Sequence, residues 1–147
     1  MTKLLLQDAD EEVKRSEHLL FISLKYTRTR DVMRNILVRL IAACELAILA
    51  LLEHAKAKKK LDEIPEFWKT RAQIASKLKQ GNKEFIELYL LLKKIYDSPY
   101  TAKEEFRKHI TMICSIDGKK IDIDVPTLTE YFKKTKMFLK YVEDEIE

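Results

Sequence analysis

The fold of this chain is decided by its most apolar stretch, Ile36-Leu37-Val38-Arg39-Leu40-Ile41-Ala42-Ala43-Cys44-Glu45-Leu46-Ala47-Ile48-Leu49-Ala50-Leu51-Leu52. Apolar side chains recur at helical spacing over about residues 30–59 and occupy nearly every side of the expected helix. A helix with so little polar surface has to be enclosed by other helices. We therefore expect a central helix, whose small residues such as Ala43 and Ala47 allow a neighbouring backbone to approach closely.

The same stretch is long enough to cross a bilayer, but Arg39 and Glu45 interrupt it, and each is costly at a bilayer centre. Acidic residues from Asp8 onward follow the short apolar run at the start of the chain, so no signal peptide is expected. The two cysteines, Cys44 and Cys114, lie far apart in apolar surroundings, which is typical of a reducing compartment. We expect a cytoplasmic protein with no membrane association.

Length and composition restrict the remaining choices. A chain of 147 residues is expected to form one domain, residues 1–147, with a core large enough to be stable without disulfides or metals. It contains only Gly 2 and Pro 3, which argues against a turn-rich β-sandwich and against a glycine-lined phosphate or dinucleotide site. Helices are the elements that this composition favours.

The rest of the chain predicts an all-α, up-and-down multi-helix bundle with a small β-hairpin before the last helix. The hairpin is expected over residues 114–123, because the pattern alternates there and Asp117-Gly118 is a strong two-residue turn. Further helices are predicted over about residues 8–27, 66–79, 82–96, 101–113 and 126–147. The residues expected to start these helices are Asp8, Thr29, Pro65, Asn82, Thr101 and Thr127.

Catalytic and metal-binding motifs are not apparent. The three histidines, His18, His54 and His109, have no recognisable partner for nucleophilic catalysis, so no catalytic residue is predicted. Glu105 and His109 have a helical i, i+4 spacing, which we interpret as a surface ion pair, and we expect no metal or cofactor. Cys114 is the better candidate for a reactive thiol, with an inert structural role as the alternative.

Arg39 and Glu45 are the two charged residues that the apolar helix would otherwise exclude, and they are candidate buried polar residues. Their spacing places them on different faces of the helix. Each is expected to find an ionic partner on another helix, with Glu17 or Glu87 as the candidates for Arg39. The alternative is that they point to a cleft or to a second subunit.

Basic and aromatic residues gather around the first expected turn between helices. This candidate nucleic-acid or ligand surface consists of Lys25, Tyr26, Arg28, Arg30 and Arg34. Arginine and lysine suit phosphate contacts, and a tyrosine can stack on a base. The formal net charge is only +4, so weak or absent nucleic-acid binding is the alternative.

The run Leu40-Ile41-Ala42-Ala43-Cys44-Glu45-Leu46-Ala47-Ile48-Leu49-Ala50-Leu51-Leu52, together with the Thr-Arg-rich turn before it, resembles the second helix of prokaryotic HEPN domains. The resemblance covers roughly the first third of the chain. It implies a helical bundle, often a homodimer, found beside toxin–antitoxin or nucleotidyltransferase partners, with some members acting as metal-independent ribonucleases. Those ribonucleases carry an Arg followed four to six residues later by a His. No such pair occurs here, because Arg15 is too close to His18 and Arg107 too close to His109.

These observations lead to one main hypothesis and two alternatives. The main one is a non-catalytic, HEPN-like interaction module, dimeric, that binds a nucleotidyltransferase-type partner or RNA. The first alternative is a diverged ribonuclease or nucleotide-acting enzyme with a site near Arg28, Arg30, Arg34 and His109. The second is a structural or regulatory bundle of unknown partner.

Overall fold

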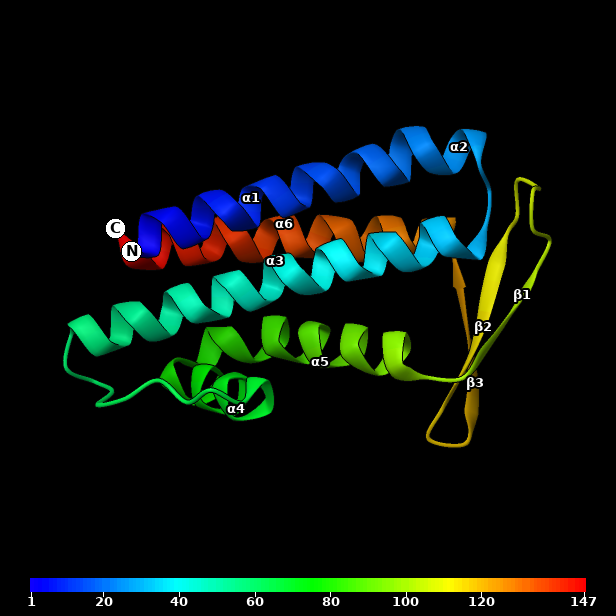
Figure 1. Cartoon of the computed structure of the whole chain (residues 1–147). Helices are drawn as coiled ribbons and strands as arrows, with labels where there is room; N and C mark the ends of the chain where they lie inside the picture. Colours follow the sequence, from blue (N-terminus) through cyan, green and yellow to red (C-terminus); the bar gives the residue numbers. More distant parts are fainter.

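Long helices lie side by side in the computed structural model, which describes all 147 residues (Figure 1). Helix α1 (Thr2–His18) continues through a π-helical turn, η1 (Leu19–Ser23), into α2 (Leu24–Tyr26), so one helical rod precedes the first turn. The central helix α3 (Arg30–Ala57) runs back along it. The N- and C-termini lie together at one end of the bundle.

The second half of the chain completes the bundle and adds a sheet. Helix α4 (Trp68–Leu78) and a short 3-10 turn, η2 (Gln80–Asn82), lead into α5 (Lys83–Asp97). After the sheet, α6 (Val125–Ile146) returns along α1 and α3, antiparallel to α5 (Figure 1). The fold is therefore mostly helical.

Three antiparallel strands in the order β1-β2-β3 close the end of the bundle opposite the termini (Figure 1). They are β1 (Tyr100–Lys103), β2 (Thr111–Ile116) and β3 (Lys119–Asp124). The predicted turn is confirmed: Asp117 and Gly118 both have positive φ, 51° and 78°, as a type I′ hairpin requires. The predicted helix over 101–113 is wrong, because β1 pairs with the first part of β2, and the fold is not all-α.

The core surrounds α3, as its apolar pattern predicted. One cluster of 33 buried residues draws on every helix and on strands β2 and β3, and α3 contributes more of them than any other element. Helix α3 is long and apolar enough to span a membrane, but 61% of its most apolar window is buried inside the protein. That burial is typical of the core helix of a bundle.

Two helix starts show how side chains fix the ends of the central elements. Thr29 caps α3 as predicted, because its hydroxyl accepts a hydrogen bond from the Val32 N–H at 3.4 Å. Helix α6 is capped by Asp124 rather than Thr127. The Asp124 carboxylate accepts hydrogen bonds from the Thr127 hydroxyl (2.6 Å) and N–H (2.9 Å), and these bonds lower the pKa of Asp124.

Three of the remaining helix starts are wrong, whereas α5 begins directly after Asn82, as predicted. Asp8 lies inside α1, which begins six residues earlier because Leu5 and Leu6 pack against the core and extend the helix. Pro65 precedes α4 without belonging to it, and Thr101 lies in β1.

Asn82 is the N-cap residue of α5, but its side chain makes no capping bond and instead links α5 to α4 and α6. Its side chain is 2% exposed, and its Nδ2 donates to the Ala75 carbonyl at 2.8 Å while its Oδ1 accepts from the Tyr141 hydroxyl at 2.7 Å. Space beside it is tight, because a Cβ on Gly81 would lie 2.8 Å from the Tyr141 hydroxyl. This amide therefore holds the α4–α5 connection against α6.

We predict that Asn82→Ala lowers the free energy of unfolding by about 1–3 kcal/mol, because the Ala75 carbonyl and the Tyr141 hydroxyl lose a buried partner. Urea unfolding followed by circular dichroism measures the change. The matched control is Asn35→Ala on the exposed side of α3, which should change stability by less than about 0.5 kcal/mol. Equal stability of the two variants would contradict this role for Asn82.

Candidate nucleic-acid interface

The structure divides the predicted basic cluster into two groups with different roles. Arg34 lies inside the fold: its guanidinium carbon is 4.2 Å from the Tyr96 ring centroid and 4.5 Å from the Tyr100 ring centroid. The same guanidinium donates a hydrogen bond to the Tyr96 carbonyl at 3.2 Å. Arg34 thus ties α3 to α5 and β1, and it is not available as a ligand contact.

The connection between β1 and β2, residues 104–110, is anchored on the turn between α2 and α3. The Phe106 N–H donates to the Arg28 carbonyl at 2.6 Å, and the Arg30 N–H donates to the Glu105 carboxylate at 3.3 Å. The Arg30 side chain also lies 3.9 Å from that carboxylate. Glu105 is therefore the partner of Arg30, and the predicted Glu105–His109 pair on a helix does not exist.

This anchoring creates a basic pocket of about 330 Å³. Its polar lining consists of Lys25 from α2, Arg28 from the α2–α3 turn, and Lys108 and His109 from the β1–β2 connection. The remaining lining is apolar and comes from η1, α2 and the start of α6. Because no carboxylate lines the pocket, its chemistry suits an anion such as a phosphate.

Two exposed aromatic side chains come from the same two segments. Tyr26 at the end of α2 is 80% exposed, and Phe106 in the β1–β2 connection is 75% exposed. Phe106 also has a positive φ of 67°. This backbone conformation is strained for an aromatic residue and costs on the order of 1–3 kcal/mol. Sequence reasoning missed Phe106, although a single aromatic inside the charged run from Lys103 to Lys108 was a visible signal.

Arg39 and Glu45 are not buried, which corrects the sequence-based expectation. Their side chains are 40% and 42% exposed. Each does find a partner on another helix: Arg39 donates to Glu12 at 3.1 Å, and Glu45 accepts from the Tyr89 hydroxyl at 2.7 Å. Glu12 replaces Glu17 and Glu87 as the partner of Arg39. Burial and the bond to Glu45 raise the pKa of Tyr89.

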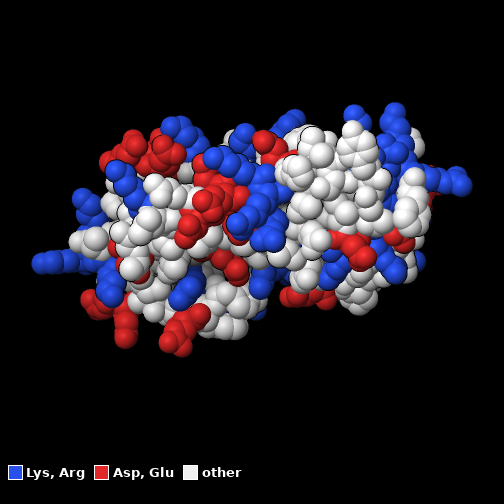
Figure 2. Space-filling model, turned by 45° about the horizontal axis from the view of Figure 1, so that its top comes forward, with Lys and Arg blue, Asp and Glu red and all other residues white.

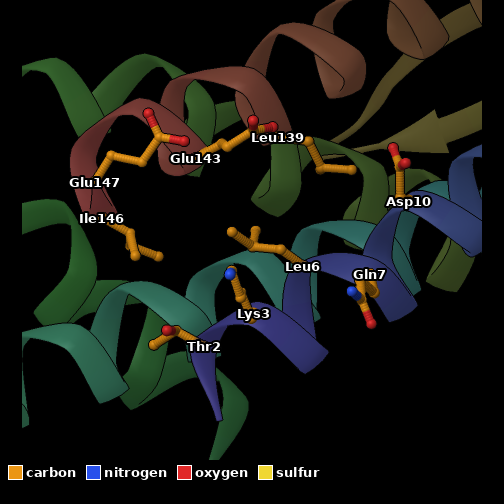
Figure 3. A pocket seen from close by; sticks show the side chains of 9 residues that line it. All are labelled: Thr2, Lys3, Leu6, Gln7, Asp10, Leu139, Glu143, Ile146 and Glu147. Carbon is orange, nitrogen blue, oxygen red and sulfur yellow. The ribbon is translucent and has the colours of Figure 1, made fainter.

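A second pocket, of about 490 Å³, lies at the opposite end of the bundle, between the start of α1 and the end of α6 (Figure 3). Lys3, Leu6 and Ile146 point into it, and Asp10, Glu143 and Glu147 stand around it, as Figure 3 shows. Carboxylates repel phosphate, so this end does not suit nucleic acid. Lys and Arg side chains project at both ends of the molecule (Figure 2), so it is the lining of the basic pocket that distinguishes the other end.

Neither cysteine is placed for chemistry. Cys44 is fully buried in α3, and burial raises the pKa of its thiol to about 12. Cys114, considered above as a reactive thiol, is 1% exposed in β2. The Cys44 thiol therefore stays protonated, and burial keeps the Cys114 sulfur away from solvent and reagents.

Comparisons with protein-family models, with curated proteins and with solved structures find no match for this chain.

Because Arg34 is engaged inside the fold, we predict that Arg34→Gln lowers the free energy of unfolding by about 1–2 kcal/mol, the combined contribution of its two ring contacts and its hydrogen bond. Arg28→Gln should change it by less than about 0.5 kcal/mol, since the anchoring bond at Arg28 uses only its backbone carbonyl. Denaturant unfolding of the two variants beside the natural protein measures both values. A reversed order would show that Arg28, not Arg34, holds this end together.

Proposed function

We propose that the chain is a HEPN-like helical module that binds single-stranded RNA as a homodimer without catalysing a reaction. The observation that carries this proposal is the basic pocket, where Lys25 and Arg28 meet Lys108 and His109 with no carboxylate in the lining. Cations that converge from segments far apart in sequence provide phosphate contacts, which dominate the affinity of most nucleic-acid complexes.

RNA is favoured over the nucleotidyltransferase-type partner that the resemblance also implies. Protein interfaces are depleted in lysine, whereas Lys25 and Lys108 both line this pocket. Exposed Tyr26 and Phe106 are available for stacking on bases. Only unpaired bases offer their faces for stacking, which supports a single strand rather than a duplex.

The first test measures binding of a short labelled oligouridine to the natural protein and its variants by fluorescence anisotropy. Phe106→Ala should weaken binding by about 1–3 kcal/mol, the range for loss of one stacked base. Arg28→Gln and Lys108→Gln should each weaken binding and reduce the slope of log K against log salt by about 0.7, as expected for one lost phosphate contact.

The matched control is Lys58→Gln, which removes an exposed lysine just beyond α3 at the other end of the bundle. It should leave both affinity and salt slope unchanged. If Lys58→Gln weakens binding as much as Arg28→Gln does, RNA affinity depends on the total charge of the protein and not on the pocket. Absence of binding even at low salt would overturn the proposal.

A ribonuclease is the second candidate, favoured by one observation: exposed His109 lines the same pocket as Arg28 and Lys108. In such a site the His109 imidazole would take the proton of a ribose 2′-hydroxyl, and the resulting alkoxide would attack the adjacent phosphorus. The 5′-oxygen would leave with a proton from the Lys108 ammonium, and Arg28 would stabilise the charge that builds up on phosphate.

This candidate predicts metal-independent cleavage of labelled RNA that His109→Ala reduces by about 10²–10⁴-fold, the usual contribution of a general base. Gel analysis should show products ending in a 2′,3′-cyclic phosphate. If the natural protein binds RNA but leaves it intact across a range of pH and with added metals, the binding proposal stands and the ribonuclease is excluded.

A further inference from the structure

An open groove runs between α5 and α6, and none of the residues that line it lines the basic pocket. It has a volume of about 410 Å³, and its apolar lining includes Phe85 and Leu91 from α5 and Tyr131 and Met137 from α6. Met137 is 61% exposed, which is unusual for so large an apolar side chain. The groove therefore presents apolar surface that nothing in the chain covers.

The two rims of this groove differ in net charge, negative on α5 and positive on α6. Glu84 and Glu87 stand along the α5 rim, and Glu130, Lys133 and Lys134 along the α6 rim. The rims do not pair across the groove: Lys133 lies 3.9 Å from Glu130 on its own helix, and the other three rim charges have no ionic partner. The unpaired charges are therefore acidic on α5 (Glu84 and Glu87) and basic on α6 (Lys134), and together with the apolar floor they make a self-complementary surface.

The direction of the helices decides which two-fold arrangement satisfies these charges. Helices α5 and α6 are antiparallel (Figure 1), and the Phe85 ring stacks on the Phe138 ring with centroids 5.0 Å apart, which fixes their register. A two-fold axis parallel to the helices lays α5 of one copy over α6 of the other. Among the lysines that line the groove, Lys134 of the partner subunit is then the one nearest in level to Glu87. A two-fold axis perpendicular to the helices would instead lay α5 over α5 and α6 over α6. Each helix would then meet the charges of its own copy.

We propose that a second copy of this chain occupies the α5–α6 groove about a two-fold axis parallel to the helices. This inference rests on the dimer of the proposed function and identifies its interface. A symmetric dimer uses the same patch on both subunits, so a surface that supplies both rims of charge fits a copy of itself. The parallel axis also keeps corresponding ends together, so both basic pockets lie at the same end of the dimer.

The test is a charge exchange measured by sedimentation equilibrium and native mass spectrometry over a range of protein concentrations. Glu87→Lys alone and Lys134→Glu alone should each raise the dimer Kd more than about tenfold, because each homodimer then contains two like-charged contacts. An equimolar mixture of the two variants should dimerise like the natural protein. In that heterodimer one contact between positions 87 and 134 keeps the natural charges and the other has both charges reversed. Both contacts are therefore attractive.

Three controls make the result specific. Circular dichroism should show both variants folded, because Glu87 and Lys134 are exposed. Glu87→Lys mixed with the natural protein should dimerise less well than the two-variant mixture; the reverse would indicate the axis across the helices. Ile22→Glu, at an exposed apolar residue on η1, should leave the dimer intact.

A natural protein that is monomeric at all concentrations, or a two-variant mixture as dissociated as its components, would overturn the proposal. So would dissociation by Ile22→Glu without dissociation by Glu87→Lys. These outcomes are separate from failure of the RNA-binding proposal, which is tested through Arg28 and Lys108 at the end of the bundle.

Discussion

The structure depends on the burial of α3. Because this helix is apolar on nearly every side, no single neighbour can cover it, and α1, α4, α5 and α6 all pack against it. At roughly 25 cal/mol per Å² of apolar surface removed from water, this enclosure is the main source of stability. The polar side chains of α3 therefore lie at its ends or at its partly exposed positions. At such a position Arg39 forms an ion pair with Glu12 on α1.

Sequence reasoning succeeded where the determinants are local. Periodicity predicted the central helix, Thr29 its cap, and Asp117-Gly118 the β2–β3 turn, because each of these features is set within a few residues. It failed at β1, where Thr101 and Glu104 have the spacing of a capping box. Strand β1 exists because it pairs with residues Thr111–Cys114 of β2, and no short-range pattern carries that pairing.

The basic pocket also combines features set by local sequence with features set by contacts between distant segments. The sequence located the basic turn, but it could not separate Arg34, which is held between two tyrosine rings, from Arg28, which lines an open pocket. That difference arises from α5 and the sheet, more than sixty residues later in the chain. Lys108 joins the pocket because the Phe106 N–H is bonded to the Arg28 carbonyl, a contact between segments that sequence spacing does not relate.

The charge distribution connects the two proposals. A net charge of +4 gives the whole molecule little general attraction for RNA, and one pocket offers only a few phosphate contacts, so a single chain would bind weakly at physiological salt. Two pockets at the same end of a dimer change this, because after the first contact the second pocket meets the same strand at high effective concentration. An arrangement with the pockets at opposite ends would give a short strand no such gain. The unpaired rim charges of the α5–α6 groove favour the arrangement in which a weak local site becomes an effective one.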